Sequence, residues 1–251
     1  MLAQTSRVAK LPWANVGDAL WQDGFSRLGI LLSQSECEEL RNLYPQTPRF
    51  RSRIEMARYR FGKGEYQYFA YPLPELVSYL RSELYKHLAP MANSWTAALH
   101  PVTPTPGVPG TPALDGRTEF PPGFDAFLTL CRDRGQSRPT PLLLRYQAGD
   151  FNCLHQDIYG ELVFPFQVIV ALSDPAVEYS GGELLLVEQR PRAQSRGHAI
   201  RLAQGEAVVI STRFRPVRSA RGFYRANVRH GVSTVTSGER FTLGIVFHDS
   251  K

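Results

Sequence analysis

Two side chains that can bind a metal ion stand two residues apart, His155 and Asp157 in "LHQDIYG". Alternate side chains of an extended strand share a face, so these two can hold one ion while Gln156 points away. His230 in "VRHGVST" is the best candidate for a third ligand. Two histidines and one carboxylate occupy one face of an octahedron and leave three positions free. That arrangement suits ferrous iron, which must hold a chelating substrate and dioxygen together, whereas structural zinc is closed by four ligands.

A His-x-Asp pair is a weak motif alone, because a chain with six histidines can contain one by chance and most isolated histidines are surface or core residues. The segments around it strengthen the prediction. They read as short apolar strands separated by Gly, Pro and Ser signals, which is typical of a sandwich or barrel. These segments are "PLLLRYQAGDFNCLH", "FPFQVIVALSDP", "GGELLLV", "HAIRL", "EAVVIS" and "RFTLGIVF".

The order of these motifs resembles that of the 2-oxoglutarate and iron(II) dependent dioxygenases, in their prolyl-hydroxylase-like branch. The resemblance runs from about Leu142 to His248. It includes Tyr146 in the strand before the His-x-Asp pair, the Gly-Gly pair in "ALSDPAVEYSGGELLLV" and the turn in "LAQGEAVVIS". It ends with His230 and, ten positions later, Arg240. The family fold implied is mainly β with flanking helices: a double-stranded β-helix (jelly-roll, cupin-like) barrel with an N-terminal helical buttress.

The resemblance also implies roles for particular residues. His155, Asp157 and His230 would bind Fe(2+), and 2-oxoglutarate would chelate that iron as a co-substrate for O2. Arg240 would bind the far carboxylate, since a guanidinium forms a bidentate fork and keeps its charge. Tyr146 and Thr242 would donate further hydrogen bonds, and Thr242 shares the face of Arg240 if "RFTLG" is extended. The alternatives are a solvated Arg240 and ordinary sheet positions for Tyr146 and Thr242.

Length and composition agree with one domain over residues 1–251. We expect a helical N-terminal part (1–140), with a proline- and glycine-rich insertion at 100–123, followed by the catalytic β core (141–251). Helices are predicted in "SQSECEELRNLY", where Ser33 and Glu36 form a capping box, in "LPELVSYLRSELYKHLAPMANSW" and in "FDAFLTLCRDRG". The segment 49–74, dense in Arg and Tyr, is either a substrate-facing lid or a loop or hairpin that packs on the barrel.

The three cysteines lack paired or metal-like spacing, and no run approaches the roughly 20 apolar residues that span a bilayer. The first residues lack the continuous apolar core of a secretion signal. We therefore expect a cytoplasmic protein without a membrane segment. The sequence does not predict the oligomeric state.

The chain is basic, with a net charge of +6, and ten arginines lie between Arg190 and Arg229 against a single acid, Glu206. These charges can attract nucleic acid, an acidic protein or an anionic metabolite, or they can form an ordinary solvated face. The stretch that leads to the distal histidine contains three candidate substrate contacts, Arg221, Arg225 and Asn227.

Three functions follow from these observations. The leading hypothesis is a hydroxylase that oxidises a C–H bond of a protein residue, peptide or small amino-acid-like molecule, with release of succinate and CO2. The second is an oxidative demethylase of alkylated nucleic acid, favoured by basicity and interleaved aromatics. Against it, such enzymes resemble one another in an Arg-x5-Arg pair after the distal histidine, and here Arg240 is the last arginine. The third is an inactive barrel that binds a partner.

Overall fold

The structure, a computed structural model, describes residues 7–99 and 119–251. The predicted insertion at 100–123 therefore lies outside the described residues, except for residues 119–123.

Helices and strands alternate in the first half, and strands alone fill the second. The helices are α2 (Trp13–Asp23), α3 (Gln34–Asn42), α4 (Glu75–Leu99) and α5 (Phe124–Asp133), with short 3-10 helices η1 (Thr47–Arg49) and η2 (Met56–Tyr59). The first strands are β1 (Phe25–Ile30), β2 (Phe50–Glu55), β3 (Gly62–Lys63), β4 (Glu65–Phe69), β5 (Leu142–Gln147), β6 (Phe151–His155) and β7 (Phe166–Ala171). They are followed by β8 (Tyr179–Gly181), β9 (Leu184–Gln189), β10 (Arg196–Ile200), β11 (Glu206–Ser211), β12 (Phe214–Ser219), β13 (Gly222–Val232) and β14 (Val235–Val246).

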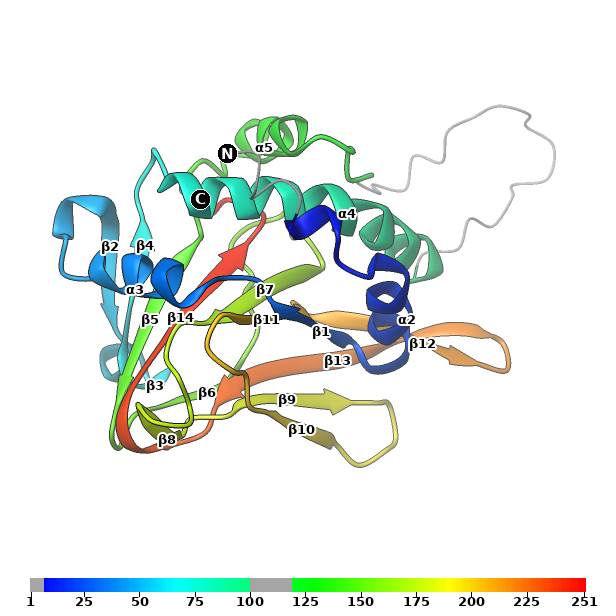
Figure 1. Ribbon diagram of the computed structural model, residues 1–251. Helices are drawn as coiled ribbons and strands as arrows, with labels where there is room; N and C mark the ends of the chain where they lie inside the picture. Colours follow the sequence, from blue (N-terminus) through cyan, green and yellow to red (C-terminus); the bar gives the residue numbers. More distant parts are fainter. Residues whose placement is uncertain (1–6, 100–118) are drawn as a thin grey trace.

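The strands form two antiparallel sheets (Figure 1). The larger sheet has the order β1-β11-β7-β14-β5-β4-β2, with β8 paired to β14. The smaller has the order β10-β9-β13-β6-β3, with β12 paired to β13. Neighbours in both sheets come from distant parts of the chain, as in a jelly roll, so the predicted mainly β fold is confirmed.

Strand alternation gives the larger sheet two different apolar faces. On β7, Phe166, Val168 and Val170 join the large core cluster under the helices. Ile169 and Ala171 alternate with them and join a second cluster with residues of β9, β10 and β11. Because the central strands are covered on both faces, their sequences need not alternate between apolar and polar residues. In β7, the four residues after Phe166 and Gln167 are all apolar.

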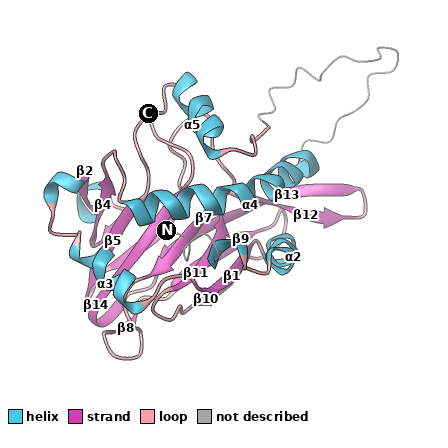
Figure 2. Cartoon of the chain, turned by 45° about the horizontal axis from the view of Figure 1, so that its top comes forward, coloured by secondary structure: helices cyan, strands magenta, loops and turns pink. Residues whose placement is uncertain are grey.

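Helices cover the outer face of the larger sheet (Figure 2), as predicted for an N-terminal buttress. The leucines that recur along α4 pack in this core, with Leu80, Leu84 and Leu88 buried. Helix α3 begins at the predicted capping box, in which the Ser33 side chain accepts from the Glu36 backbone N–H and the Glu36 carboxylate accepts from the Ser33 N–H.

The first half of the chain also adds strands to both sheets. The sequence allowed a hairpin in residues 49–74, but it did not predict that these strands or β1 join the sheets. Strand β1 pairs with β11, and β4 pairs with both β2 and β5. The segment 49–74 is thus built around a β2–β4 pair that extends the larger sheet, while β3 joins the smaller one. In the described part of the chain, no helix has the length and hydropathy needed to cross a membrane.

A buried ion pair joins α4 to the end of the chain. Arg81 Nη2 lies 2.7 Å from Asp249 Oδ1, and neither side chain is more than 3% exposed. The same guanidinium donates to the backbone carbonyls of Val246 and Phe247. The exit of β14 is therefore held against α4 by a fully satisfied buried network.

We predict that Arg81→Leu destabilises the protein by about 3–5 kcal/mol, because it leaves the Asp249 carboxylate buried without its charge partner. Urea unfolding followed by circular dichroism measures this loss. Lys86→Ala is the matched control, since it removes an exposed pair with Glu83 on the same helix and should cost no more than about 0.5 kcal/mol. Equal effects of the two variants would contradict the prediction.

Candidate active site

A cavity of about 190 Å³ is lined by both sheets, and strand alternation determines which side chains reach it. On β14, Phe241, Leu243 and Ile245 face the helices. The intervening Arg240, Thr242 and Gly244 line the cavity. Their partners on β5, in the same order, are Tyr146, Leu144 and Leu142, which line it too.

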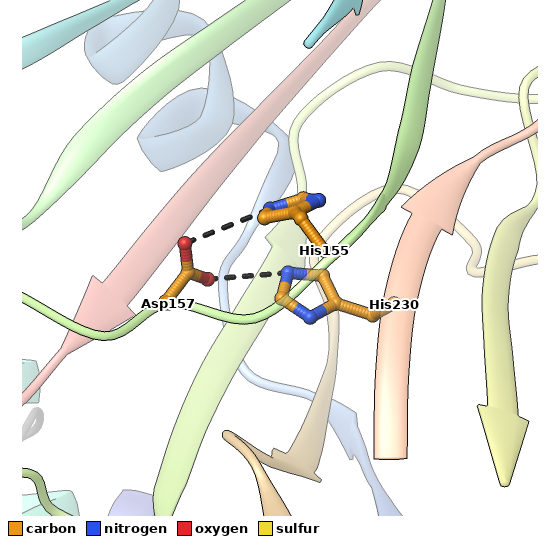
Figure 3. Close-up of side chains that lie close together, drawn as sticks. All are labelled: His155, Asp157 and His230. Carbon is orange, nitrogen blue, oxygen red and sulfur yellow. Dashed lines mark ion pairs between the residues drawn. The ribbon is translucent and has the colours of Figure 1, made fainter. Parts of the chain in front are cut away.

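The three predicted metal ligands converge at this cavity (Figure 3). His155 is the last residue of β6 and pairs directly with His230 on β13, so their rings lie 4.2 Å apart between centroids. Asp157 Oδ2 lies 3.1 Å from His230 Nε2, and Oδ1 lies 3.6 Å from His155 Nε2. One ligand atom from each residue falls within 4.8 Å of the others. Asp157 lies just beyond the strand end, not within a strand as the spacing argument assumed.

Hydrogen bonding leaves the correct ring nitrogen of His155 available to a metal ion. Its Nδ1 lies 2.8 Å from the carbonyl oxygen of Cys153, which can only accept, so Nδ1 carries the proton. In the neutral imidazole the Nε2 atom, which lies 3.6 Å from Asp157 Oδ1, is then the nitrogen with a free lone pair. Such a partner on the outer nitrogen is usual for histidines that ligate metals.

The charges of the site also fit a cation. Burial alone raises the pKa of Asp157, but His230 and His155 together hold it well below its ordinary value. Burial and the neighbouring His155 lower the pKa of His230, which favours the neutral ligand form. Burial also lowers the pKa of His155, yet its contacts with Asp157 outweigh this and raise it. The site thus holds one carboxylate and two imidazoles that compete for protons. A metal ion that binds them would displace these protons.

Arg240 is buried at the wall of the same cavity, with 4% of its surface exposed. Its Nε and Nη1 atoms are buried and have no hydrogen-bond partner among the described residues. A Cβ atom on Gly182 would lie 2.9 Å from Arg240 Cδ, and Gly182 has a φ of +65°. The Gly-Gly pair noted in the sequence therefore makes room for this guanidinium. A buried, unsatisfied cation of this kind calls for an anionic ligand.

Tyr146 and Thr242 stand near Arg240, as the sequence suggested. The Arg240 guanidinium lies 5.4 Å from the centroid of the Tyr146 ring. Burial raises the pKa of Tyr146, so its hydroxyl stays protonated, and Asn152 donates to it at 3.2 Å. Thr242 shares the cavity-facing side of β14 with Arg240.

The three candidate substrate contacts lie elsewhere. Arg221 is exposed at the turn between β12 and β13, and Arg225 is exposed on β13 with its guanidinium 5.6 Å from the Phe214 ring. Neither these two nor Asn227 lines the cavity. Asn227 is one contact away, because its Oδ1 accepts from the amide of Gln156, which does line the cavity.

Several lining residues were missed by sequence reasoning. Tyr159 donates a 2.5 Å hydrogen bond to Asp157 Oδ1, and only its spacing two residues after Asp157 could have indicated it. Gln167 on β7 is buried, and its Nε2 atom has no partner among the described residues. Phe61 and Tyr66 come from the segment 49–74 and had no motif to mark them.

Comparison with known proteins identifies relatives at two levels. The model of the Oxygenase-NA family, described as an oxygenase catalysing oxidative methylation of damaged DNA, matches residues 64–107 and 110–250. The uncharacterized protein Rv2227 of Mycobacterium tuberculosis is 48% identical over 182 residues, which is 72% of each chain.

Solved structures with a similar fold are oxygenases. A prolyl-4-hydroxylase from Pseudomonas putida has a TM-score of 0.51 and 15% identity, over 95% of this chain and 99% of that one. A Burkholderia pseudomallei oxidoreductase of the 2OG-Fe(II) oxygenase family has a TM-score of 0.51 and 16% identity, over 96% and 93%. A Trichoplax adhaerens prolyl hydroxylase, in complex with a peptide fragment of hypoxia inducible factor, has a TM-score of 0.50 and 15% identity, over 99% and 92%. At these identities the likeness establishes the fold.

We predict that Asp157→Ala weakens Fe(II) binding by about 100-fold or more, since loss of a ligand should exceed the 10- to 100-fold cost of losing an outer partner. Anaerobic calorimetric titration of the metal-free protein measures the affinity. His198→Ala, which removes a histidine that packs edge-on against Phe25 outside the cavity, is the control and should bind Fe(II) normally. Unchanged binding by Asp157→Ala would place the metal elsewhere.

Proposed function

Since this chain belongs to the Oxygenase-NA family, we propose that it is an Fe(II)- and 2-oxoglutarate-dependent oxygenase that oxidises a methyl group on a nucleic-acid base. One observation carries the proposal: His155, Asp157 and His230 converge on a cavity that is also lined by Arg240, whose buried Nε and Nη1 atoms have no hydrogen-bond partner among the described residues.

The donor set fits ferrous iron. Two neutral imidazole nitrogens and one carboxylate form the facial arrangement that leaves positions open for other ligands. His155 and His230 are held by the pairing of β6 with β13, and Asp157 is fixed by Tyr159. Bound iron would supply the activation of dioxygen that side chains cannot perform.

The surroundings of Arg240 fit the far carboxylate of 2-oxoglutarate. A guanidinium can bind a carboxylate in a bidentate fork. The buried Nε and Nη1 atoms of Arg240 have no hydrogen-bond partner among the described residues, so each edge of the guanidinium still has a donor to offer. The hydroxyl groups of Tyr146 and Thr242 lie on the same wall and would add neutral donors. Leu142, Leu144, Ile169 and Leu184 give the same cavity apolar lining, which would limit access of water to a bound co-substrate.

The overall reaction balances with these components. Each turnover would consume one O2 and one 2-oxoglutarate, and would yield one hydroxylated carbon, one succinate and one CO2. When that carbon is a methyl group on a ring nitrogen, the hydroxymethyl product releases formaldehyde and leaves N–H. The protein contributes position and exclusion of water, because the lining residues hold the reacting groups in one enclosed space.

The mouth of the cavity supports a nucleic-acid substrate. Tyr59 and Phe61 are 55% and 47% exposed, and their rings stack with centroids 5.5 Å apart. Phe61 lines the cavity, and the flanking Arg58, Arg60 and Lys63 are exposed. Aromatic faces interleaved with cations bind single-stranded or flipped nucleotides by stacking and phosphate contacts.

A polar group inside the cavity suits recognition of a base. The register of β7 with β14 places Gln167 opposite Val246, and Ala171 opposite Thr242. Gln167 therefore lies several residues along the sheet from Arg240, at the other end of the cavity lining. Its amide Nε2, which has no partner among the described residues, can donate to the polar edge of a base.

The family match favours the nucleic-acid alternative over the protein or amino-acid substrate that the sequence put first. The likeness to prolyl hydroxylases supports the fold and carries no argument about the substrate.

We predict that Arg240→Met weakens 2-oxoglutarate binding by roughly 30-fold or more, because removal of one partner of a buried charge pair costs about 2 kcal/mol at least. Calorimetry on the Mn(II)-loaded protein measures the affinity. Arg229→Met changes an exposed arginine of β13, next to His230, and should leave the affinity unchanged. Equal affinities of wild type and Arg240→Met would exclude Arg240 as the anchor.

We predict that the Fe(II)-loaded enzyme demethylates N-methylated single-stranded oligonucleotides, and that Phe61→Ala raises KM at least about 5-fold by loss of stacking. Release of formaldehyde is the measurement. Phe223→Ala, which truncates a phenylalanine of similar exposure (43%) outside the cavity lining, is the control. Turnover of proline-containing peptides or free amino acids in place of the oligonucleotides would overturn the assignment of substrate.

A further inference from the structure

The carboxylate of Asp157 has two oxygens in different surroundings. Oδ1 accepts a hydrogen bond from the Tyr159 hydroxyl at 2.5 Å. Oδ1 also lies 3.6 Å from His155 Nε2, whereas Oδ2 faces His230 Nε2 at 3.1 Å. A phenol hydroxyl next to an ionised carboxylate acts as the donor of a charge-assisted hydrogen bond, so one of the two oxygens is already engaged.

Tyr159 is held in this position from several sides. Its ring packs edge-on against Tyr68, with centroids 6.0 Å apart, and lies 5.9 Å from His248. The Arg51 guanidinium lies 4.4 Å from the centroid of the Tyr68 ring. The Tyr159 ring is therefore packed between neighbouring rings that help to keep its hydroxyl beside Asp157.

The backbone after Tyr159 is anchored as well. Gln136 Oε1 accepts from the Leu162 N–H, while its Nε2 donates to the carbonyls of Leu162 and Asp249. A Cβ atom on Gly160 would lie 2.4 Å from the Gln136 side chain, so only glycine fits beside this amide. Gln136 thereby joins the segment between Asp157 and Leu162 to the backbone of Asp249, which follows β14.

We propose that Tyr159 is a positioning residue: it engages Oδ1 of Asp157 so that the carboxylate binds the metal ion through Oδ2 alone. A carboxylate that binds through both oxygens would take one of the three positions that the facial set leaves free. Single-oxygen binding keeps all three for the two chelating oxygens of the co-substrate and for dioxygen. The inference rests on the proposed function, because it assumes that the site holds a divalent metal ion.

The test counts water molecules on bound Mn(II), which replaces Fe(II) and relaxes the protons of exchangeable waters. Wild type and Tyr159→Phe are compared at saturating protein, without co-substrate. We expect the relaxivity of each bound ion to fall by about one third in Tyr159→Phe, since the freed Oδ1 displaces one of three waters. If Tyr159 had a purely structural role, Tyr159→Phe would change the melting temperature but not the relaxivity of each bound ion.

Tyr85→Phe is the matched control. It also removes one buried hydroxyl, which donates to the Pro121 carbonyl at 2.8 Å, but it lies in the core under the helices. Its bound Mn(II) should keep the relaxivity of wild type. The same relaxivity in Tyr159→Phe would overturn the proposal while leaving the proposed function intact, whereas failure of wild type to bind Mn(II) or Fe(II) would overturn both.

A second measurement keeps the proposal testable if Tyr159→Phe does not fold. The crystal structure of Mn(II)-bound wild type should show one Asp157 oxygen on the metal ion and the other on the Tyr159 hydroxyl. Coordination by both oxygens would contradict the proposal.

Discussion

The antiparallel pairing of β13 with β6 is the constraint on which the site depends. It sets His230 directly opposite His155 on neighbouring strands, so two imidazoles meet whose positions in the chain are 75 residues apart. Because side chains alternate along a strand, a shift of one residue in this register would turn one ring to the other face and separate the ligands. The other elements either hold this register or complete the site around it.

The larger sheet supplies the opposite wall of the cavity at an energetic cost. Arg240 is buried there, and in the ranges 7–99 and 119–251 no carboxylate bonds to its Nε or Nη1 atom, although an unpaired buried charge is unfavourable. The helical core behind β14 and the glycine at position 182 allow this arrangement, since apolar packing stabilises the strand and the missing Cβ leaves space. Arg240 and Gln167 both line this cavity, and both have buried polar atoms without a partner in the described part of the chain, as expected of a site that binds a polar ligand.

The sequence predicted the parts of this molecule that depend on local pattern. Apolar periodicity placed α4 and the strands of the second half, and the ordered motifs indicated which histidines and which arginine come together. The position of β1, β3 and β4 in the sheets was not predictable, because each pairs with a strand more than 70 residues away in the chain. Tyr159 and Gln167 were missed for a related reason, as a single polar residue reveals its role only when its neighbours are known. The proposed substrate contacts Arg221 and Arg225 do not line the cavity, because they lie on the hairpin formed by β12 and β13.

The most direct test of this account is anaerobic absorption spectroscopy of the wild-type protein with Fe(II) and 2-oxoglutarate. A co-substrate that chelates protein-bound ferrous iron through its keto group and carboxylate produces a visible charge-transfer band that neither component shows alone. We expect this band to saturate at one Fe(II) and one 2-oxoglutarate per chain. A folded protein that binds both components without developing the band would contradict the account, because the metal ion and the co-substrate would then occupy separate sites.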